Sequence, residues 1–419
     1  MSIAAQAAKR TININDIPLN GKVTTFSYYE SLLSPFVTAN FSYIDTGNSV
    51  ASTRIDDPQE RLGTLRSALP LRGNEKVSFK FTTSLGSLEF NKYQLLVDRS
   101  FLAGQESQRE GVIIRLLSPS YNKNIETFVK EKYYNSISDS ARKIISEKLK
   151  VPSDRIKLDK TKNPYAFTGS NRKPFDVLMD IAGKSVSPTG EPGYFIYETK
   201  SGMNFRSIDS LISQSPKATY VYNGVFKSDL KNDSNAFRIL TQPIKKEQSI
   251  SSSLKSGMYS ALFRFMFEDD QVTKEVLYKI KVNQNSLGKR TVEFDPQLAE
   301  SPSRLYTVFV PKGMMEKGIK NITNNSPADY LARAVMRYNL LFVQTLDILV
   351  PCNPNLEAGD VIDCKFEKVT TSSKSPGSTD IPQSGKYLIL NLCHHYNTTN
   401  SYTSLSLVRD TYGRSGGVG

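Results

Sequence analysis

The chain has 419 residues and a formal net charge of +13, with 38% hydrophobic and 23% charged residues. This length exceeds what one compact core usually covers, and the composition is ordinary for a folded protein, so we expect several structural units. The charge is compatible with a nucleic-acid or other acidic partner. However, Lys and Arg are interspersed with Asp and Glu even in the densest basic stretch, residues 143–173, which predicts a solvated face.

The first region of the chain has the pattern of β-strands. Apolar and polar residues alternate in three stretches between residues 22 and 119, namely 37–43, 77–81 and 112–116. A period of two places one side of a strand in a core and the other in water or at an interface. We therefore predict an antiparallel β-barrel domain over residues 1–118.

Helical periodicity then appears between residues 119 and 208. A helix capped by Ser138 and a second helix from Pro174 to Gly183 precede an apolar strand at 194–197. This order predicts a small α/β module.

Strand patterns return after this module and are interrupted once more. Residues 241–324 contain further alternating segments and are predicted to form an inserted β-rich module. A helix is expected to start at Ser326-Pro327, where Ser is a good cap and Pro fits the first helical position. We assign 209–240 and 325–412 to a second, split β-barrel and 413–419 to a flexible tail.

The two β-rich ends of the chain share an order of features. Each has a Gly-containing turn, a strand ending Lys-Phe, a Tyr-led strand, a loop and a final strand. The corresponding segments are 72–81, 93–97 and 111–117 near the start, and 358–366, 387–390 and 404–410 near the end. An internal duplication is our interpretation, although unrelated antiparallel regions can also share such features. The expected fold class is α+β, mainly β, with two related antiparallel β-barrel domains, a small α/β module and an inserted β-rich module.

Several short motifs resemble one known family. The segments 356–362, 384–389, 394–395 and 403–410 resemble the end of the baseplate central hub proteins of contractile-tailed bacteriophages. The segments 174–178, 194–198 and 204–208 are similar to the α/β module of the same family. Type VI secretion spike proteins share this fold in their N-terminal part.

The resemblance implies a structural role without enzymatic activity or cofactors. It implies a homotrimeric ring in the virion tail baseplate, assembled in the host cytoplasm, whose barrels line a tube. The implied partners are the central spike protein, the tail tube or tube-initiator proteins, the tape-measure protein and baseplate wedge proteins. DNA would pass only in transit, and no membrane is involved.

The histidines and cysteines give little support to a metal site. His394 and His395 are adjacent, so in a strand they point to opposite faces. We expect one to be buried and hydrogen-bonded and the other to lie at an interface. Cys393, with Cys364 or Cys352, matches no standard zinc spacing, but a shared site on a trimer axis stays open. The odd number of cysteines argues against a disulfide framework and predicts reduced thiols.

No catalytic motif stands out. Gly183-Lys184-Ser185 would end a phosphate-binding loop only if position 178 were Gly, and it is Leu178. We assign no catalytic, cofactor-binding or metal-binding residue. Asp360 after Gly359 is expected to stabilise a turn.

Three further expectations concern charge, alternative functions and membranes. Arg409-Asp410 is expected to form a strand-end or intersubunit ion pair. There are two alternative functions. The charge favours a nucleic-acid-binding module. The other alternative is a glycan-binding or glycan-cleaving tail protein, in which Tyr133, Tyr134 and Tyr194 stack on sugars. Neither a signal peptide nor an apolar run near the roughly 20 residues of a membrane span is found.

Overall fold

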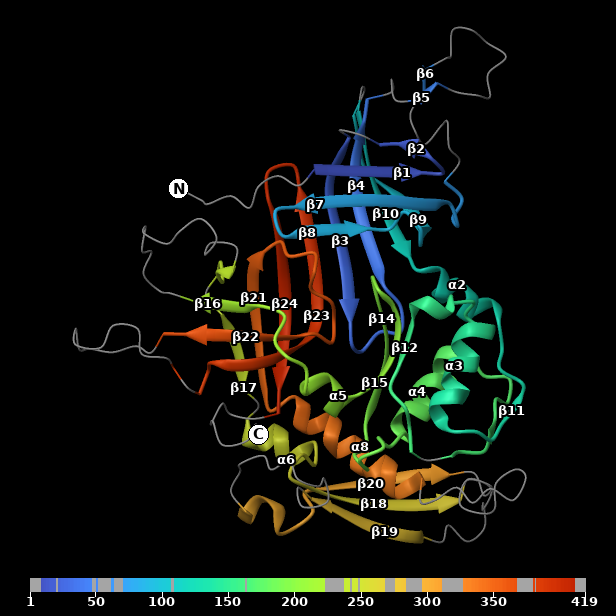
Figure 1. Ribbon diagram of the computed structural model, residues 1–419, viewed down its shortest axis with the longest axis vertical. Coiled ribbons are helices and arrows are strands. Elements are labelled where there is room, and N and C mark those ends of the chain that lie inside the picture. Colours follow the sequence, from blue (N-terminus) through green and yellow to red (C-terminus); the bar gives the residue numbers. More distant parts are fainter. Residues whose placement is uncertain are drawn as a thin grey trace, which may run out of the picture.

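A computed structural model of the chain describes residues 9–19, 22–46, 50–51, 62–63, 71–106, 109–162, 164–222, 237–241, 243–247, 249–267, 276–283, 296–310, 327–367, 380 and 382–410. Its main feature is a sheet of 14 strands, to which both ends of the chain contribute. Figure 1 shows the helices of the α/β module beside this sheet and a small three-stranded sheet below it. The predicted tail, 413–419, and Ser326 lie outside the described residues.

The first half of the main sheet comes from residues 9–117. It contains β1 (Lys9–Ile14), β2 (Ile17–Pro18), β3 (Val23–Ser31), β4 (Thr38–Asp45), β7 (Lys76–Thr83), β8 (Gly86–Glu89), β9 (Leu95–Glu106) and β10 (Arg109–Leu117). The strands run in the order β3-β4-β10-β9-β7-β1-β2, and β8 pairs with β7. A separate pair is formed by β5 (Val50–Ala51) and β6 (Leu62–Gly63).

The second half comes from later in the chain. It contains β16 (Thr219–Tyr222), β17 (Ile244–Glu247), β21 (Gln344–Pro351), β22 (Val361–Phe366), β23 (Gly385–Asn397) and β24 (Ser401–Arg409). These strands run in the order β17-β21-β24-β23, while β22 pairs with both β16 and β23. Because β23 also pairs with β3, the two halves form one continuous sheet. The described pairings follow an open path from β17 to β2 and do not close two separate barrels.

The predicted alternation is confirmed in these strands. Ala39, Phe41 and Tyr43 of β4 are buried, and so are Leu405 and Leu407 of β24. The inward side chains form one apolar core under the first half of the sheet and another under the second half. Burial of one face explains why each strand has a fixed register.

The predicted α/β module contains both helices and short sheets. Its helices are α2 (Pro119–Glu126), α3 (Ile137–Glu147), η2 (Ser153–Arg155), α4 (Pro174–Gly183) and α5 (Ile208–Ile212), and its strands are β11 (Lys132–Tyr133), β12 (Ile156–Leu158), β13 (Phe167–Thr168), β14 (Tyr194–Thr199) and β15 (Gly202–Ser207). The bounds predicted for α4 are confirmed. The cap predicted for α3 is wrong: Ser136 accepts the hydrogen bond from Asp139 N at 3.2 Å. Ser138 is buried and accepts instead from Thr161 N at 3.3 Å.

The predicted inserted module contains a three-stranded sheet. The module contains α6 (Ile250–Lys255), β18 (Ser260–Phe267), β19 (Val276–Asn283), η5 (Pro296–Ala299) and β20 (Arg304–Val310). The following helix, α8 (Pro327–Leu341), packs against β18 and β19. The strand order is β19-β18-β20, and β18 and β20 are parallel. β17 falls within the range predicted for this module, but it pairs with β21 of the main sheet. The start of α8 agrees with the predicted helix.

Phe81 gives a test of the shared packing between the two halves. Its buried ring lies 4.4 Å from the Phe26 ring in the first half and 4.3 Å from the Tyr396 ring in β23, measured between centroids. We expect Phe81→Ala to lower the free energy of unfolding by about 3–5 kcal/mol, because it leaves a cavity between both halves. Urea unfolding would measure this, with the exposed Phe101 as control, where Phe101→Ala should change the value by less than about 0.5 kcal/mol. Equal effects of the two substitutions would contradict the assignment of Phe81 to packing shared by the two halves.

Candidate functional site at a buried polar junction

Three parts of the chain meet at a buried polar junction. They are β3 of the main sheet, the turn between β14 and β15, and the loop 352–360 between β21 and β22. Three carboxyl groups lie in this junction: those of Glu30 and Glu198, residues that are only 2% and 1% exposed, and that of Glu357. Buried carboxyl groups are costly unless they are hydrogen-bonded, so their partners define the site.

Glu30 connects all three parts. It follows Phe26 and Tyr28 on the inward side of β3. Its Oε1 accepts hydrogen bonds from the Tyr28 hydroxyl at 2.8 Å and from Lys200 N at 2.7 Å, and its Oε2 accepts from Ala358 N at 2.8 Å. Burial, followed by the negative charge of Glu357, raises the pKa of Glu30 to about 8.

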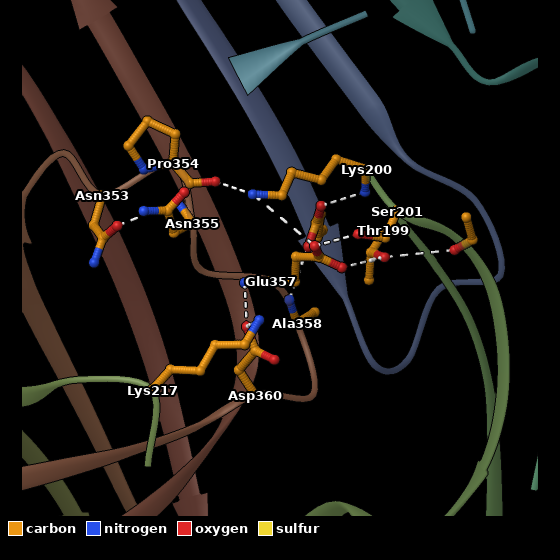
Figure 2. A network of polar contacts seen from close by, with 12 residues as sticks. Thr199, Lys200, Ser201, Lys217, Asn353, Pro354, Asn355, Glu357, Ala358 and Asp360 are labelled. Carbon is orange, nitrogen blue, oxygen red and sulfur yellow. Dashed lines mark hydrogen bonds and ion pairs between the residues drawn. The ribbon is translucent and has the colours of Figure 1, made fainter. Parts of the chain in front are cut away.

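Glu357 and Lys200 form the second part of the junction, drawn in Figure 2. The Glu357 carboxylate accepts hydrogen bonds from Thr199 Oγ1 at 2.7 Å and from the Ser201 hydroxyl, and lies 4.0 Å from Lys200 Nζ. Lys200 Nζ also donates to the carbonyl of Pro354. Burial alone would raise the pKa of Glu357, but the bond from Ser201 and the charge of Lys200 outweigh it and lower the pKa.

Glu198 ties β14 to the first half of the sheet. Its Oε2 accepts from Ser120 Oγ at 2.9 Å and from Val37 N at 3.2 Å, and its Oε1 accepts from the Tyr93 hydroxyl at 3.3 Å. Burial is the main cause that raises the pKa of Glu198. Arg155, whose guanidinium lies 4.0 Å from the Tyr93 ring centre, donates to the Lys200 carbonyl and so joins the two carboxyl sites.

The turn at Gly359-Asp360 shapes the loop. Asp360 Oδ2 accepts a hydrogen bond from Glu357 N at 2.7 Å, which confirms the role predicted for Asp360. The same oxygen lies 2.8 Å from Lys217 Nζ, so the segment before β16 is held to the loop. Gly359 has φ +88°, and a Cβ there would lie 2.5 Å from the Tyr197 hydroxyl oxygen, which explains the requirement for glycine.

A second buried ion cluster lies at the end of β24. Arg337 of α8 donates to Asp410 Oδ2 at 2.9 Å and to Asp209 Oδ1 of α5 at 3.0 Å. Burial alone would lower the pKa of Arg337, but the charges of Asp410 and Asp209 raise it. Asp410 therefore forms a buried pair within the chain, with Arg337 as its partner.

Arg409, the other member of the predicted pair, points elsewhere. Its guanidinium donates to Gln344 Oε1 at 2.6 Å and to the Ser384 carbonyl at 2.9 Å, and lies 4.4 Å from the Tyr387 ring centre. Burial lowers the pKa of Arg409. Arg409 and Asp410 thus stabilise separate contacts of the strand end.

The adjacent histidines point to opposite faces of β23, as predicted. His394 is fully buried, with Nδ1 2.9 Å from Thr403 Oγ1, and burial lowers its pKa to about 3. His395 lies on the other face with Nδ1 2.8 Å from Ser27 Oγ. Cys352 and Cys364 are buried free thiols and Cys393 is half-buried. Within the described ranges, no group of three or more His, Cys, Asp or Glu side chains is arranged to hold a metal ion.

Other predicted motifs take structural positions. Gly183 ends α4 and Lys184 Nζ lies 2.6 Å from Asp180, as expected for a helix end. Two of the aromatic residues considered for sugar stacking, Tyr133 and Tyr194, are buried in the core, which contradicts that role for them. Across the part of the chain that the structure describes, no helix is long and apolar enough to cross a membrane.

The junction carboxylates were not identified from the sequence. A signal was available, because Glu30 and Glu198 occupy positions where the strand pattern requires an apolar side chain. Such residues are buried only with specific partners. Their partners here are main-chain N–H groups and hydroxyls, so the geometry is suited to fixing three segments together.

Comparison with known proteins identifies the fold. Neither a protein-family model nor a curated protein sequence matches the chain. The 43 kDa tail protein of prophage MuSo2 from Shewanella oneidensis is 8% identical, with a TM-score of 0.55 over 96% of this chain and 99% of that chain. The tail protein from Neisseria meningitidis MC58 is 11% identical, with a TM-score of 0.56 over 96% and 97% of the two chains. A type VI secretion system component from Escherichia coli gives a TM-score of 0.46 at 10% identity, over 97% and 78%.

The chain therefore has the fold of phage tail proteins. The first two likenesses extend over nearly the whole of each chain, so the fold includes the main sheet, the α/β module and the β18–β20 sheet together. The resemblance inferred from short sequence motifs is confirmed at the level of the fold.

Arg337 gives a test of the buried ion cluster. We expect Arg337→Ala to lower the free energy of unfolding by about 3–5 kcal/mol, because Asp209 and Asp410 would remain buried without their cation. Urea unfolding measures the change. The control is Arg115→Ala, which removes an exposed pair with Asp98 at 3.7 Å and should cost no more than about 1 kcal/mol. If Arg337→Ala lowered the free energy of unfolding by less than Arg115→Ala does, the assignment of a buried ion cluster would be contradicted.

Two glycines with similar backbone angles test the packing of the loop. Gly190 has φ +98° and nothing lies within 4 Å of the point that an added Cβ would occupy, whereas Gly359 faces Tyr197. Gly190→Ala should cost about 1–2 kcal/mol from backbone strain alone. Gly359→Ala should cost a further ~1–3 kcal/mol because of the clash. Thermal unfolding of both variants would check this, and equal losses would exclude the close approach to Tyr197.

Proposed function

We propose that this chain is a structural hub component of a contractile phage tail baseplate. The observation that carries the proposal is the likeness to two tail proteins along 96% of the chain. The sequence resemblance to baseplate hub proteins supports the finer assignment. The role is mechanical, with no enzymatic step.

The pairing of the strands supports an internal duplication. In the first half, β7 pairs with the start of β9, and β9 pairs with β10. In the second half, β22 pairs with the start of β23, and β23 pairs with β24. Both sets are antiparallel, with a long central strand and a register shift toward the third strand. They differ in that β8 lies between β7 and β9 in the chain and pairs with β7. The corresponding sequence segments are those that suggested the duplication.

The duplication supplies a way to match two symmetries. A homotrimer of a chain with two related β units presents six such units in a ring. We propose that this ring adapts the sixfold tail tube to the threefold central spike and leaves a lumen for the tape-measure protein and, later, for DNA. Residues 1–118 and the split region 209–240 with 325–412 would supply the barrels. Residues 119–208 would form the small α/β module and residues 241–324 a peripheral module, and baseplate wedge proteins are further candidate partners.

The continuous sheet and the buried junction suit this role. β23 is shared between the halves, and Glu30, Lys200 and Glu357 hold the α/β module against both. A subunit built in this way keeps a fixed angle between its two β units. A ring that transmits force needs such fixed angles.

The oligomeric state tests the proposal. Native mass measurement of the purified chain, alone and with its spike partner, should give a species of three 46.9 kDa chains, and electron microscopy should show a ring with a central hole. A stable monomer under both conditions would overturn the trimeric hub assignment. Salt-sensitive binding of DNA by a monomer would instead favour the nucleic-acid alternative.

A further inference from the structure

The junction has an unusual balance of charge. Glu30 and Glu357 are two carboxyl groups near one half-buried ammonium, that of Lys200, which lies 4.0 Å from Glu357. If both carboxyls were ionised, the group of three would carry one uncompensated negative charge in the interior. An unpaired buried charge is strongly unfavourable, so the arrangement favours one proton on the carboxyl pair.

The burial and the charged neighbours of the two carboxyl groups indicate where that proton resides. Glu357 receives two hydroxyl donors and lies near Lys200, all of which stabilise its ionised form. Glu30 has no ammonium in hydrogen-bond contact within the described residues. Its three hydrogen-bond donors also favour the ionised form, but the burial of Glu30, which is 2% exposed, and the negative charge of Glu357 outweigh them, so the proton resides on Glu30.

The surrounding groups do not remove the imbalance. The charged and titratable groups near the pair, from the elements packed against it, are Tyr28, Arg155, Lys157, Tyr197, Glu198, Lys200, Lys217, Cys352, Glu357, Asp360 and His394. The positive charge of Arg155 acts on Glu198, whose carboxyl is also buried. Asp360 and Lys217 form their own pair at 2.8 Å. His394 is neutral near pH 7 because burial lowers its pKa to about 3. Lys157 is exposed on β12, where solvent screens its charge.

We propose that Glu30 is a proton-dependent clasp, which holds the 199–202 turn and the 352–360 loop against β3 when protonated and loosens when it ionises. The direction follows from linkage. The pKa of Glu30 is raised to about 8 in the folded state, above its ordinary value of 4.5. The free energy that Glu30 contributes to the closed junction is therefore fully present below about pH 4.5 and is lost as the pH rises through about 8. The clasp is a property of the subunit and does not depend on the proposed hub function.

Residue-resolved hydrogen exchange on the full chain tests the clasp. The amides of Lys200 and Ala358 both donate to Glu30, whereas the nearby Leu32 amide donates to the Leu390 carbonyl. After correction for intrinsic exchange, opening at Lys200 and Ala358 should increase about tenfold per pH unit between pH 6 and about 8 and then level off, because one proton is released on opening. Opening at Leu32 should stay constant.

Variants separate the clasp from general pH effects. Glu30→Gln should abolish the pH dependence of opening at Lys200 and Ala358. The control Glu89→Gln, which removes an exposed carboxylate paired with Lys80, should leave that pH dependence unchanged. Glu357→Gln removes the neighbouring negative charge, so the increase in opening at Lys200 and Ala358 should level off at a lower pH. A flat profile in the unmodified chain would overturn the proposal, even if Glu30→Gln failed to fold. A slope that persists in Glu30→Gln would also overturn it.

Discussion

The antiparallel pairing of β23 with β3 is the contact on which the rest of the described structure depends. It joins strands about 360 residues apart, with Asn391 opposite Ser31 and Asn397 opposite Thr25. Without it the two halves of the sheet would be separate units, each with an open edge. With it, β23 has partners on both sides, so its inward residues contribute to both cores. The Tyr396 contact with Phe81 is one result of this arrangement.

The register of this pairing also builds the junction. Glu30 and His394 point inward, whereas Tyr29, Cys393 and His395 point outward. A slip of one residue would exchange these faces and move the Glu30 carboxyl away from Lys200 and Ala358. Outward polar contacts, such as Ser31 to Asn391 at 2.6 Å, help to set the register. The polar junction and the sheet are therefore consequences of one alignment.

Sequence periodicity predicted the strands and helices whose form depends on the burial of one face. The strands around Phe41 and Leu405 and the helix from Pro174 follow from patterns within ten residues, and all are confirmed. The cap at Ser138 was wrong because a contact with Thr161, 23 residues away, competes with the local role. The pairing of β17 with β21 joins residues about 100 positions apart, and no periodicity reports such a partner. Glu30 and Glu198 could be noticed as carboxylates in apolar positions, but their partners could not.

These buried charges are better understood as devices for orientation than for stability. Replacing a buried ion pair by apolar residues of similar volume is often neutral or stabilising. Apolar packing, however, tolerates small rotations that hydrogen bonds to main-chain N–H groups do not. Glu30 and Glu198 bind donors from several parts of the chain, and Glu357 joins its loop to the 199–202 turn, so each fixes a relative position. The Arg337 cluster does the same for α5, α8 and the end of β24. If the chain has the proposed hub function, such contacts matter more than additional apolar burial, because an error in angle within one chain would be repeated by every copy in the proposed ring.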